Sequence, residues 1–533
     1  MLMPLLQTNG KSLLLKHVAL SSILVLATFL WEGNKGYSLW DEGYLWYGSQ
    51  RVLAGEVPIR DFMAYDPGRY YWVAGFMALF GDHGIMALRV ALALFQVLGV
   101  TVGLGLVARS AKGAAGKTDI LYLTLSALVV LIWMFTRHKV FDISVSIFLV
   151  GTLSLLVAAP SARRYLLTGI AVGIAAIIGR NHGVYGLVGS LGVTLWLHAF
   201  SETKPGLVKS CCLLAAGVVL GFLPLLLALF LVPGLGKAFW ESVKFIFEQG
   251  ATNLPLPVPW PWKVDFSAHP FTAAFPNFLV GIFFIVVLTF GAAALAWSIY
   301  QGWKGKPVQP AFVGAAFMAL PYAHFAFSRA DPSHLAQGIA PLVLGALVFT
   351  AARPVPSRWL LAGGLFAMSA CAVLRFHPGW QCAVVEKCVE LEISGNRIEM
   401  DGRTASDVAL LRGLAKEYAG NGRSFMAAPF WPGSYALLER RSPVWEIYPV
   451  FSRPASFQEA EISRLQAERP GFIIIIDQAL DGRAEYLYGN SHPLVYQFIL
   501  ENYERLDYPE NPTYKIYLDR RPGTDVSAGL PQR

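Results

Sequence analysis

Apolar residues dominate long stretches of the chain up to about residue 375, and polar and apolar residues mix beyond that point as in a soluble domain. A helix that crosses a membrane needs about 20 mostly apolar residues. The pattern therefore predicts a polytopic α-helical membrane domain over residues 1–376 with about eleven transmembrane helices. The candidate spans are residues 13–31, 84–108, 119–136, 141–159, 165–179, 183–200, 209–231, 277–299, 309–327, 335–352 and 358–376.

Residues 377–533 alternate between strand-like and helix-like patterns. The β-branched run "FIIIID" at 472–477 predicts a buried strand, and "SFMAAP" at 424–429 predicts another. The stretches "ASDVALLRGLAKEYAGNG" and "ASFQEAEISRLQAERP" are typical of helices, and "YERLDYPENPTYKIYLDR" is typical of a hairpin. This alternation predicts a small C-terminal α/β domain.

The composition excludes several classes of protein. Hydrophobic residues make up 55% of the 533 residues and charged residues 15%, with a mean hydropathy of +0.48. A soluble domain carries about 25% charged residues, so a soluble enzyme of this size and a disordered chain are both excluded. The net charge of +8 does not indicate nucleic-acid binding, because Lys and Arg orient membrane proteins.

Short loops on one side of the predicted spans are all basic. The residues are Lys11 and Lys16, then Arg109, Lys112 and Lys117, then Arg163 and Arg164, Lys204 and Lys209, Lys304 and Lys306, and Arg353 and Arg358. Cytoplasmic loops carry such an excess of Lys and Arg. The sequence thus predicts a bacterial inner (plasma) membrane protein with a cytoplasmic N-terminus and a periplasmic or external C-terminal domain. Cys382 and Cys388, after the last span, can pair if that compartment is oxidising.

The loops on the opposite side carry acids, histidines and aromatic residues beside their cations. They span residues 32–83, 136–142, 179–183, 232–276 and 328–334. Ionisable residues at membrane depth are costly and usually serve a pathway or a site. The amphipathic stretch at 237–262 turns into a Pro- and Trp-rich segment, which is either a loop that covers a substrate or a plain interfacial helix.

The first external loop, 32–83, predicts two surface helices, "DEGYLWYGSQRVLAG" and "GRYYWVAGFMALFG", both too short to span. Asp41 is either the N-cap of the first helix or a catalytic base beside the membrane. Glu42 is either a functional acid or a first-turn charge that complements the helix dipole.

The segment "WDEGYLWYGSQRVLAGEVPIRDFMAYDPGRYYW", after a hydrophobic first span, resembles the GT-C glycosyltransferases. It is most similar to family-39-like lipid-linked sugar transferases, the relatives of protein O-mannosyltransferases and of the lipid A aminoarabinose transferase. The resemblance implies that Asp41 deprotonates or orients the acceptor hydroxyl, with Glu42 in support. The late segment "SRADPSHLAQGIAPLV", which contains His334, lies where relatives carry a His or Arg followed by an apolar, Pro-containing helix. It matches that motif more weakly, because the closer forms of the motif are absent.

A polyprenyl-phosphate sugar donor leaves its phosphate behind, so cations must stabilise the charge that develops there. Arginine binds phosphate in a bidentate manner and lysine as a point charge. The predicted donor phosphate set is Arg137, Lys139, Arg180 and Arg329. Further candidate substrate-binding residues are His138, His182, Asp66, Arg69, Lys244 and His334. The alternative is that these cations anchor the protein to lipid headgroups.

The predicted function is transfer of a sugar from a polyprenyl-phosphate donor to an external acceptor, which is a saccharide, glycolipid or protein. A cell-envelope glycan or glycolipid is favoured over protein; membrane lipids are further partners, and nucleic acid is not. A flippase of lipid-linked sugars is the alternative, although no inverted internal repeat is visible. A structural subunit is the third hypothesis. Asp41, Glu42, His138, His182 and His334 are candidate metal ligands without a ligand-type spacing, so cofactor and metal use is unknown.

Overall fold

The computed structural model describes residues 8–111, 119–250, 253–385 and 387–520. The chain divides into two compact units, each assembled from separate stretches. The first, here named the membrane unit, comprises Met1–Lys35, Tyr65–Val73 and Met86–Glu386. The second, here named the α/β unit, comprises Gly36–Ala64, Ala74–Ile85 and Lys387–Arg533. The predicted basic residues Lys112 and Lys117 lie outside the described residues.

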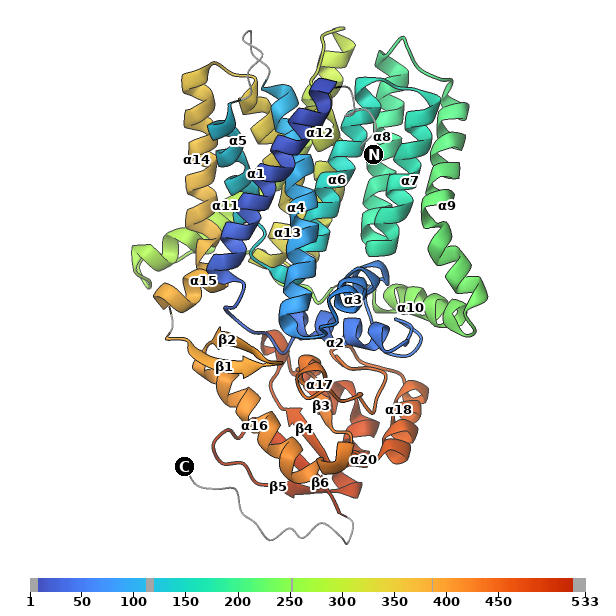
Figure 1. The fold of residues 1–533 in the computed structure, drawn as a ribbon, viewed down its shortest axis with the longest axis vertical. Coiled ribbons are helices and arrows are strands. Elements are labelled where there is room, and N and C mark those ends of the chain that lie inside the picture. The colour runs from blue at the N-terminus through green and yellow to red at the C-terminus, as the bar shows by residue number, and fades with distance from the viewer. Residues whose placement is uncertain (1–7, 112–118, 251–252, 386, 521–533) are drawn as a thin grey trace. The chain divides into compact units, whose positions relative to one another are not determined.

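The membrane unit is a bundle of long helices (Figure 1). These helices are α1 (Thr8–Glu32), α4 (Ile85–Ser110), α5 (Ile120–Ile132), α6 (Val140–Ala158), α7 (Ala162–Ile178), α8 (Arg180–Phe200), α9 (Leu207–Leu231), α11 (Phe271–Trp303), α12 (Pro310–Ser328), α13 (Pro332–Ala351) and α14 (Val355–Val373). Helix α10 (Leu235–Gln249) follows α9, and α3 (Gly68–Phe80) begins in this unit. Every predicted span coincides with one of the long helices, which confirms the predicted bundle.

Nine helices among the described residues are long and apolar enough to cross a membrane. The other two predicted spans, α5 and α7, have 13 and 17 residues. At 1.5 Å per residue they measure about 20 and 26 Å, less than the hydrocarbon core of about 30 Å.

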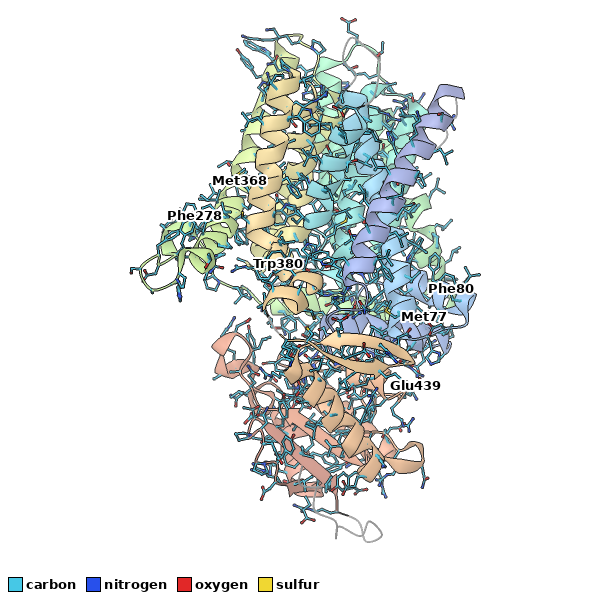
Figure 2. All side chains as sticks on the ribbon, turned by 60° about the vertical axis from the view of Figure 1, so that its left-hand side comes forward. Met77, Phe80, Phe278, Met368, Trp380 and Glu439 are labelled. Carbon is cyan, nitrogen blue, oxygen red and sulfur yellow. The ribbon has the colours of Figure 1, made fainter. Side chains whose placement is uncertain are left out.

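The outer surface of the bundle is apolar. The side chains of Leu30 and Phe230 are 73% and 88% exposed. Figure 2 shows Met368 of α14 likewise on the outer side of the bundle. Apolar surface of this extent is stable only under lipid, as expected for a chain that spans a membrane.

Helices α7 and α9 pack through glycines spaced four residues apart on each helix, Gly169 and Gly173 on α7 and Gly217 and Gly221 on α9. A Cβ added to Gly169 would lie 2.1 Å from the carbonyl oxygen of Leu214. A Cβ on Gly221 would lie 2.2 Å from that of Ile170. Small residues at this spacing let membrane helices approach backbone to backbone.

Three segments predicted as external loops are instead the starts of helices. Residues 137–139 form a turn of 3-10 helix that leads into α6, α8 begins at Arg180, and α13 begins at Pro332. The predicted loops 136–142, 179–183 and 328–334 are therefore too long. The polar side chains of these segments lie in or next to first helical turns, where unpaired backbone N–H groups favour negative charge.

The α/β unit contains a mixed sheet of four strands in the order β3-β4-β6-β5. Strand β3 (Met426–Ala428) is parallel to β4 (Phe472–Ile476), while β6 (Tyr514–Asp519) is antiparallel to β4 and to β5 (Tyr503–Leu506). All five residues of β4 are buried, as in strands covered on both faces. The remaining elements are the hairpin β1 (Val389–Ile393) and β2 (Asn396–Met400) and the helices α16 (Gly402–Tyr418), α17 (Gly433–Leu437), α18 (Ala455–Glu468), α19 (Tyr488–Ser491) and α20 (Pro493–Asn502). The predicted small α/β fold is confirmed.

Helix α2 (Asp41–Leu53), predicted as a surface helix, belongs to the α/β unit, and its residues Glu42–Ser49 are all buried. The Tyr47 hydroxyl accepts a 2.9 Å hydrogen bond from the backbone N–H of Ser442. The ring of Trp40 stacks on Phe430 with centroids 4.1 Å apart. Protein, in place of lipid, therefore covers the aromatic side of this helix.

The close approach of α2 to α17 gives a first prediction. A Cβ on Gly43 would lie 2.4 Å from the Cα of Gly433, so Gly43→Ala should destabilise the α/β unit by about 1–3 kcal/mol through overpacking. Thermal unfolding of the purified full-length protein, with limited proteolysis, measures the effect.

The matched control is Gly413→Ala on α16, where a Cβ meets nothing within 4 Å. Alanine is the better helix former at both positions, so the control should be neutral or stabilising. A stabilised Gly43→Ala variant would contradict the close contact.

Candidate functional site

Helices α6, α8 and α13 begin and α1, α7 and α12 end at the same end of the membrane unit (Figure 1). Charged side chains form ion pairs at this end, here named the polar end. At the centre of this polar end is the ion pair between Arg69 of α3 and Asp142 in the first turn of α6, with Nη2 3.2 Å from Oδ1. The two residues are 6% and 3% exposed. A buried ion pair of this kind is stable only when its other hydrogen bonds are also made.

His182 extends the pair into a network across three transmembrane helices. Its Nε2 lies 3.0 Å from Asp142 Oδ1, and its Nδ1 lies 2.7 Å from the hydroxyl of Tyr322 on α12. His182 and Tyr322 are both fully buried. The second carboxylate oxygen of Asp142, Oδ2, is buried and accepts no hydrogen bond from the described residues.

Arg69 also holds the end of α7. Its Nε and Nη2 donate to the carbonyl oxygen of Ile178 at 3.1 and 3.0 Å. The last carbonyls of a helix lack intrahelical partners, and a cation near them is favourable. The starts of α3 and α6 and the end of α7 are thus connected through one guanidinium group.

The four predicted phosphate ligands differ in how they are engaged. Arg137 donates to the carbonyl oxygen of Glu32 at 2.6 Å and to that of Lys35, so it closes the end of α1. Lys139 lies with its ammonium 5.6 Å from the centroid of the Tyr65 ring. No carboxylate of the described chain lies within 4.0 Å of that ammonium. The guanidinium carbon of Arg69 lies 5.2 Å from the centroid of the same ring. Two cations therefore lie close to one aromatic ring.

Arg180 is paired with Asp66. Its Nε lies 2.7 Å from Asp66 Oδ1, and its backbone N–H donates to Asp66 Oδ2 at 2.8 Å. The guanidinium also donates to Ser242 of α10 at 2.9 Å and stacks over Phe239. Asp66 therefore fixes the first turn of α8, and Arg180 ties α10 to it.

Asp331 binds both Arg329 and His334. Arg329 Nε donates to Oδ2 at 3.1 Å, and His334 Nδ1 lies 2.9 Å from Oδ1. The same carboxylate caps α13 through the backbone N–H of His334. Burial raises the pKa of Asp331. The hydrogen bonds and charge of His334 and the charge of Arg329 lower it by a larger amount, so the pKa of Asp331 lies below its ordinary value.

The other predicted site residues are His138, Lys244, Asp41 and Glu42. His138 is half-buried beside Lys139. Lys244 is exposed on α10 and lies 3.3 Å from Glu248. Asp41 and Glu42 belong to the α/β unit. Asp41 is the first residue of α2 and Trp40 its N-cap, so the N-cap interpretation of Asp41 is wrong. Both acids lie in the first turn, where they complement the helix dipole.

The sequence analysis did not predict that the network extends into the transmembrane helices, nor that Tyr185 and Tyr322 take part in it. Tyr185 of α8 lies with its hydroxyl 2.5 Å from Nδ1 of His324 on α12, beside Tyr322. The available signal was a histidine inside an apolar span, which usually has a polar partner. Among the described residues, no group of three or more His, Cys, Asp or Glu is placed to hold a metal ion.

Comparison with known structures identifies the fold as that of the GT-C membrane proteins, as the first loop predicted. ArnT from Cupriavidus metallidurans in the apo state is 14% identical and superimposes with a TM-score of 0.50, over 94% of this chain and 97% of ArnT. ArnT bound to undecaprenyl phosphate gives 0.49 at 15% identity, over 97% and 99%. The Archaeoglobus fulgidus oligosaccharyltransferase in the apo form gives 0.46 at 12% identity, over 97% and 75%. No protein-family model and no curated protein sequence matches the chain.

The buried ion pair gives a second prediction. Asp142→Asn leaves the buried guanidinium of Arg69 without its carboxylate, which should cost about 3–5 kcal/mol of stability. Thermal unfolding followed by tryptophan fluorescence in detergent measures the loss. The exposed Asp265→Asn variant serves as the matched control and should shift stability by no more than about 0.5 kcal/mol.

Adding Arg69→Gln to Asp142→Asn removes both charges and should recover part of the loss. Equal unfolding midpoints for Asp142→Asn and Asp265→Asn would show that the pair does not stabilise the bundle.

Proposed function

We propose that this protein is a glycosyltransferase that moves a sugar from a polyprenyl-phosphate donor to an acceptor on the external face of the membrane. The observation that carries the proposal is the placement of Lys139 and Arg69 around Tyr65 at the polar end of the bundle. The GT-C fold agrees with it, although a fold alone does not define an activity.

The polar end suits an anionic donor headgroup for two physical reasons. The first turns of α6, α8 and α13 lie there, and helix N-termini attract anions. Lys139 has no carboxylate within 4.0 Å among the described residues, so a phosphate can neutralise it without displacing a partner. Arg180 and Arg329 already pair with Asp66 and Asp331, which gives them a supporting part in the proposed site.

Each side chain of the proposed site has one role in the reaction. The Asp41 carboxylate takes the proton of the acceptor hydroxyl, and the resulting oxygen attacks the anomeric carbon of the donor. The bond between that carbon and the phosphate oxygen breaks, and polyprenyl phosphate leaves with the bonding electrons. Lys139 and the other cations of the predicted phosphate set, Arg137, Arg180 and Arg329, stabilise the charge on the leaving phosphate, and Arg69 lies beside Lys139 at the ring of Tyr65. Glu42 supports Asp41.

The external position of this chemistry rests on two observations. Along the chain, the basic loops alternate with the segments that form the polar end, as expected if the basic loops are cytoplasmic. Cys382 and Cys388, which follow α14, are disulfide-bonded, and disulfides persist in oxidising compartments. We therefore propose a bacterial inner-membrane protein whose α/β unit is periplasmic. A glycan or glycolipid of the cell envelope is the proposed acceptor.

Asp41→Asn provides the direct test of the transfer reaction. The full-length protein in detergent is incubated with a panel of undecaprenyl-phosphate-linked monosaccharides and an envelope lipid extract as acceptor source. Release of undecaprenyl phosphate and mass spectrometry of the products report transfer. Loss of a general base should lower turnover at least 100-fold while binding of undecaprenyl phosphate is retained.

Asp82→Asn, an exposed acid of the same predicted loop, is the control and should keep its activity. No release by the wild-type protein for any donor, with headgroup movement in proteoliposomes, would instead identify a flippase. Wild-type activity in Asp41→Asn would reject the role of Asp41 as base.

Lys139→Gln tests the phosphate site separately. The variant should bind undecaprenyl phosphate at least tenfold more weakly, because a hydrogen bond to a charged group contributes about 1.5–3 kcal/mol. Native mass spectrometry or thermophoresis measures the dissociation constant. Lys263→Gln, an exposed lysine of the segment after α10, should bind as the wild type does. Equal weakening in both variants would indicate a general charge effect.

A further inference from the structure

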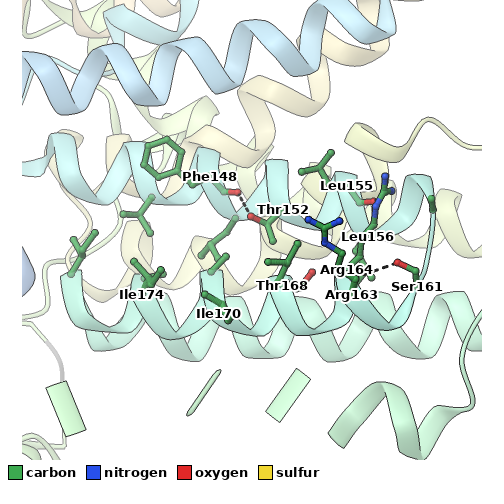
Figure 3. A pocket seen from close by; sticks show the side chains of 17 residues that line it. Phe148, Thr152, Leu155, Leu156, Ser161, Arg163, Arg164, Thr168, Ile170 and Ile174 are labelled. Atoms are coloured by element: carbon green, nitrogen blue, oxygen red, sulfur yellow. Dashed lines mark hydrogen bonds between the residues drawn. The ribbon is translucent and has the colours of Figure 1, made fainter. Parts of the chain in front are cut away.

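A long groove runs between α6 and α7, with a cavity volume of about 880 Å³ (Figure 3). Most of its lining is aliphatic or aromatic, including Phe148, Ile170 and Ile174. Its lining residues on α7 extend from Arg163 to Ile178. At 1.5 Å per residue this is about 22 Å, which exceeds the about 15 Å depth of one half of the hydrocarbon core. An acyl chain of a bilayer lipid therefore fits along it.

The polar lining of the groove is concentrated at one end. Ser161, Arg163 and Arg164 line that end, at the connection between α6 and α7 (Figure 3). The hydroxyl of Thr152, further along, donates to the carbonyl oxygen of Phe148 in its own helix. The Ser161 hydroxyl caps α7 by accepting from the N–H of Arg164. The arginines therefore supply the polar chemistry at this end.

Arg164 retains most of its hydrogen-bonding capacity. It is half-buried, and its Nη1 donates to the carbonyl oxygen of Leu155 near the end of α6. A guanidinium group has five N–H donors. Within the described part of the chain no carboxylate lies within 4.0 Å of Arg164. The neighbouring cation Arg109 adds positive charge within electrostatic range. Arg163 is exposed at the same end.

We propose that this groove binds an anionic diacyl phospholipid of the surrounding bilayer. One acyl chain lies between α6 and α7, and the headgroup phosphate binds Arg163 and Arg164. The proposal is independent of the glycosyl transfer reaction, because Lys139 and the groove arginines lie at opposite ends of α6.

The polyprenyl tail of a donor is the rival occupant of the groove. Such a donor would have its phosphate at the Lys139 end, and its apolar tail would then run toward the guanidinium groups at the far end. Desolvating arginine against hydrocarbon is costly, whereas a phospholipid phosphate satisfies the same groups. Charge complementarity therefore favours a phospholipid whose head lies at the α6–α7 connection.

Native mass spectrometry of the delipidated full-length protein tests the proposal. The protein is titrated with phosphatidylglycerol and with phosphatidylcholine of identical acyl chains. Phosphatidylglycerol should bind more tightly to the wild type. Each arginine near a membrane surface contributes about fivefold to the binding of anionic lipid. The double variant Arg163→Gln/Arg164→Gln should therefore bind phosphatidylglycerol about 30-fold more weakly and phosphatidylcholine unchanged.

Two further variants separate the headgroup from the groove. Lys204→Gln/Lys209→Gln removes one charge from the connection between α8 and α9 and one from the first turn of α9, both outside the groove lining, and should bind both lipids as the wild type does. Ala171→Trp fills the groove and should weaken both lipids. Circular dichroism and the unfolding midpoint report folding. Should the double variant not fold, the exposed Arg163→Gln alone should show the fivefold loss.

Three results would overturn the proposal. Equal affinity for the two lipids would show that the headgroup charge is not recognised. An equal loss in the Lys204→Gln/Lys209→Gln variant would show diffuse attraction of anionic lipid. Undecaprenyl phosphate would be identified as the occupant if it displaced phosphatidylglycerol and if its binding were weakened by Ala171→Trp but unchanged by both arginine substitutions.

Discussion

The buried ion pair of Arg69 and Asp142 is the interaction on which the polar end of the membrane unit depends. A charge in the interior of a membrane bundle must be neutralised and hydrogen-bonded in place. Arg69 meets this requirement through Asp142 and the carbonyl oxygen of Ile178. Asp142 in turn orients His182, and His182 binds Tyr322. One charge pair therefore fixes the start of α3 against α6, α7, α8 and α12.

This constraint separates two kinds of cation at the polar end. Arg69, Arg180 and Arg329 are each paired with an aspartate and hold helix ends in position. Lys139 contacts the ring of Tyr65, without an ion-pair partner in the described chain. The paired cations define the geometry, and the local positive potential that an arriving anion meets comes chiefly from Lys139 and the helix N-termini. In the proposed site, the phosphate of the donor would therefore bind Lys139 without breaking the pairs that maintain the fold.

Much of the fold could be predicted from the sequence. Apolar runs of about 20 residues indicate membrane helices directly, and the β-branched run at 472–476 indicates the central strand. The start of α8 was harder to predict, because Arg180 places a cation in the first turn, where the helix dipole disfavours positive charge. Asp66 compensates for this by pairing with Arg180 from a distant segment. The docking of Gly43 on Gly433 is likewise a long-range contact that no local periodicity encodes.

The two ends of the bundle show how the same residue types serve different physical purposes. At the polar end, Arg69, Arg180 and Arg329 each pair with an aspartate, so their charges are largely cancelled and their geometry is rigid. At the other end, Arg358 pairs with Asp119, but Arg109 and Arg164 lie near one another with no carboxylate within 4.0 Å in the described chain. Like charges that are left uncompensated repel each other and attract anions from outside the protein. The proposed orientation in the membrane and the proposed attraction of anionic lipid would both follow from these charges, whereas the pairs at the polar end hold helix ends in position around the proposed site.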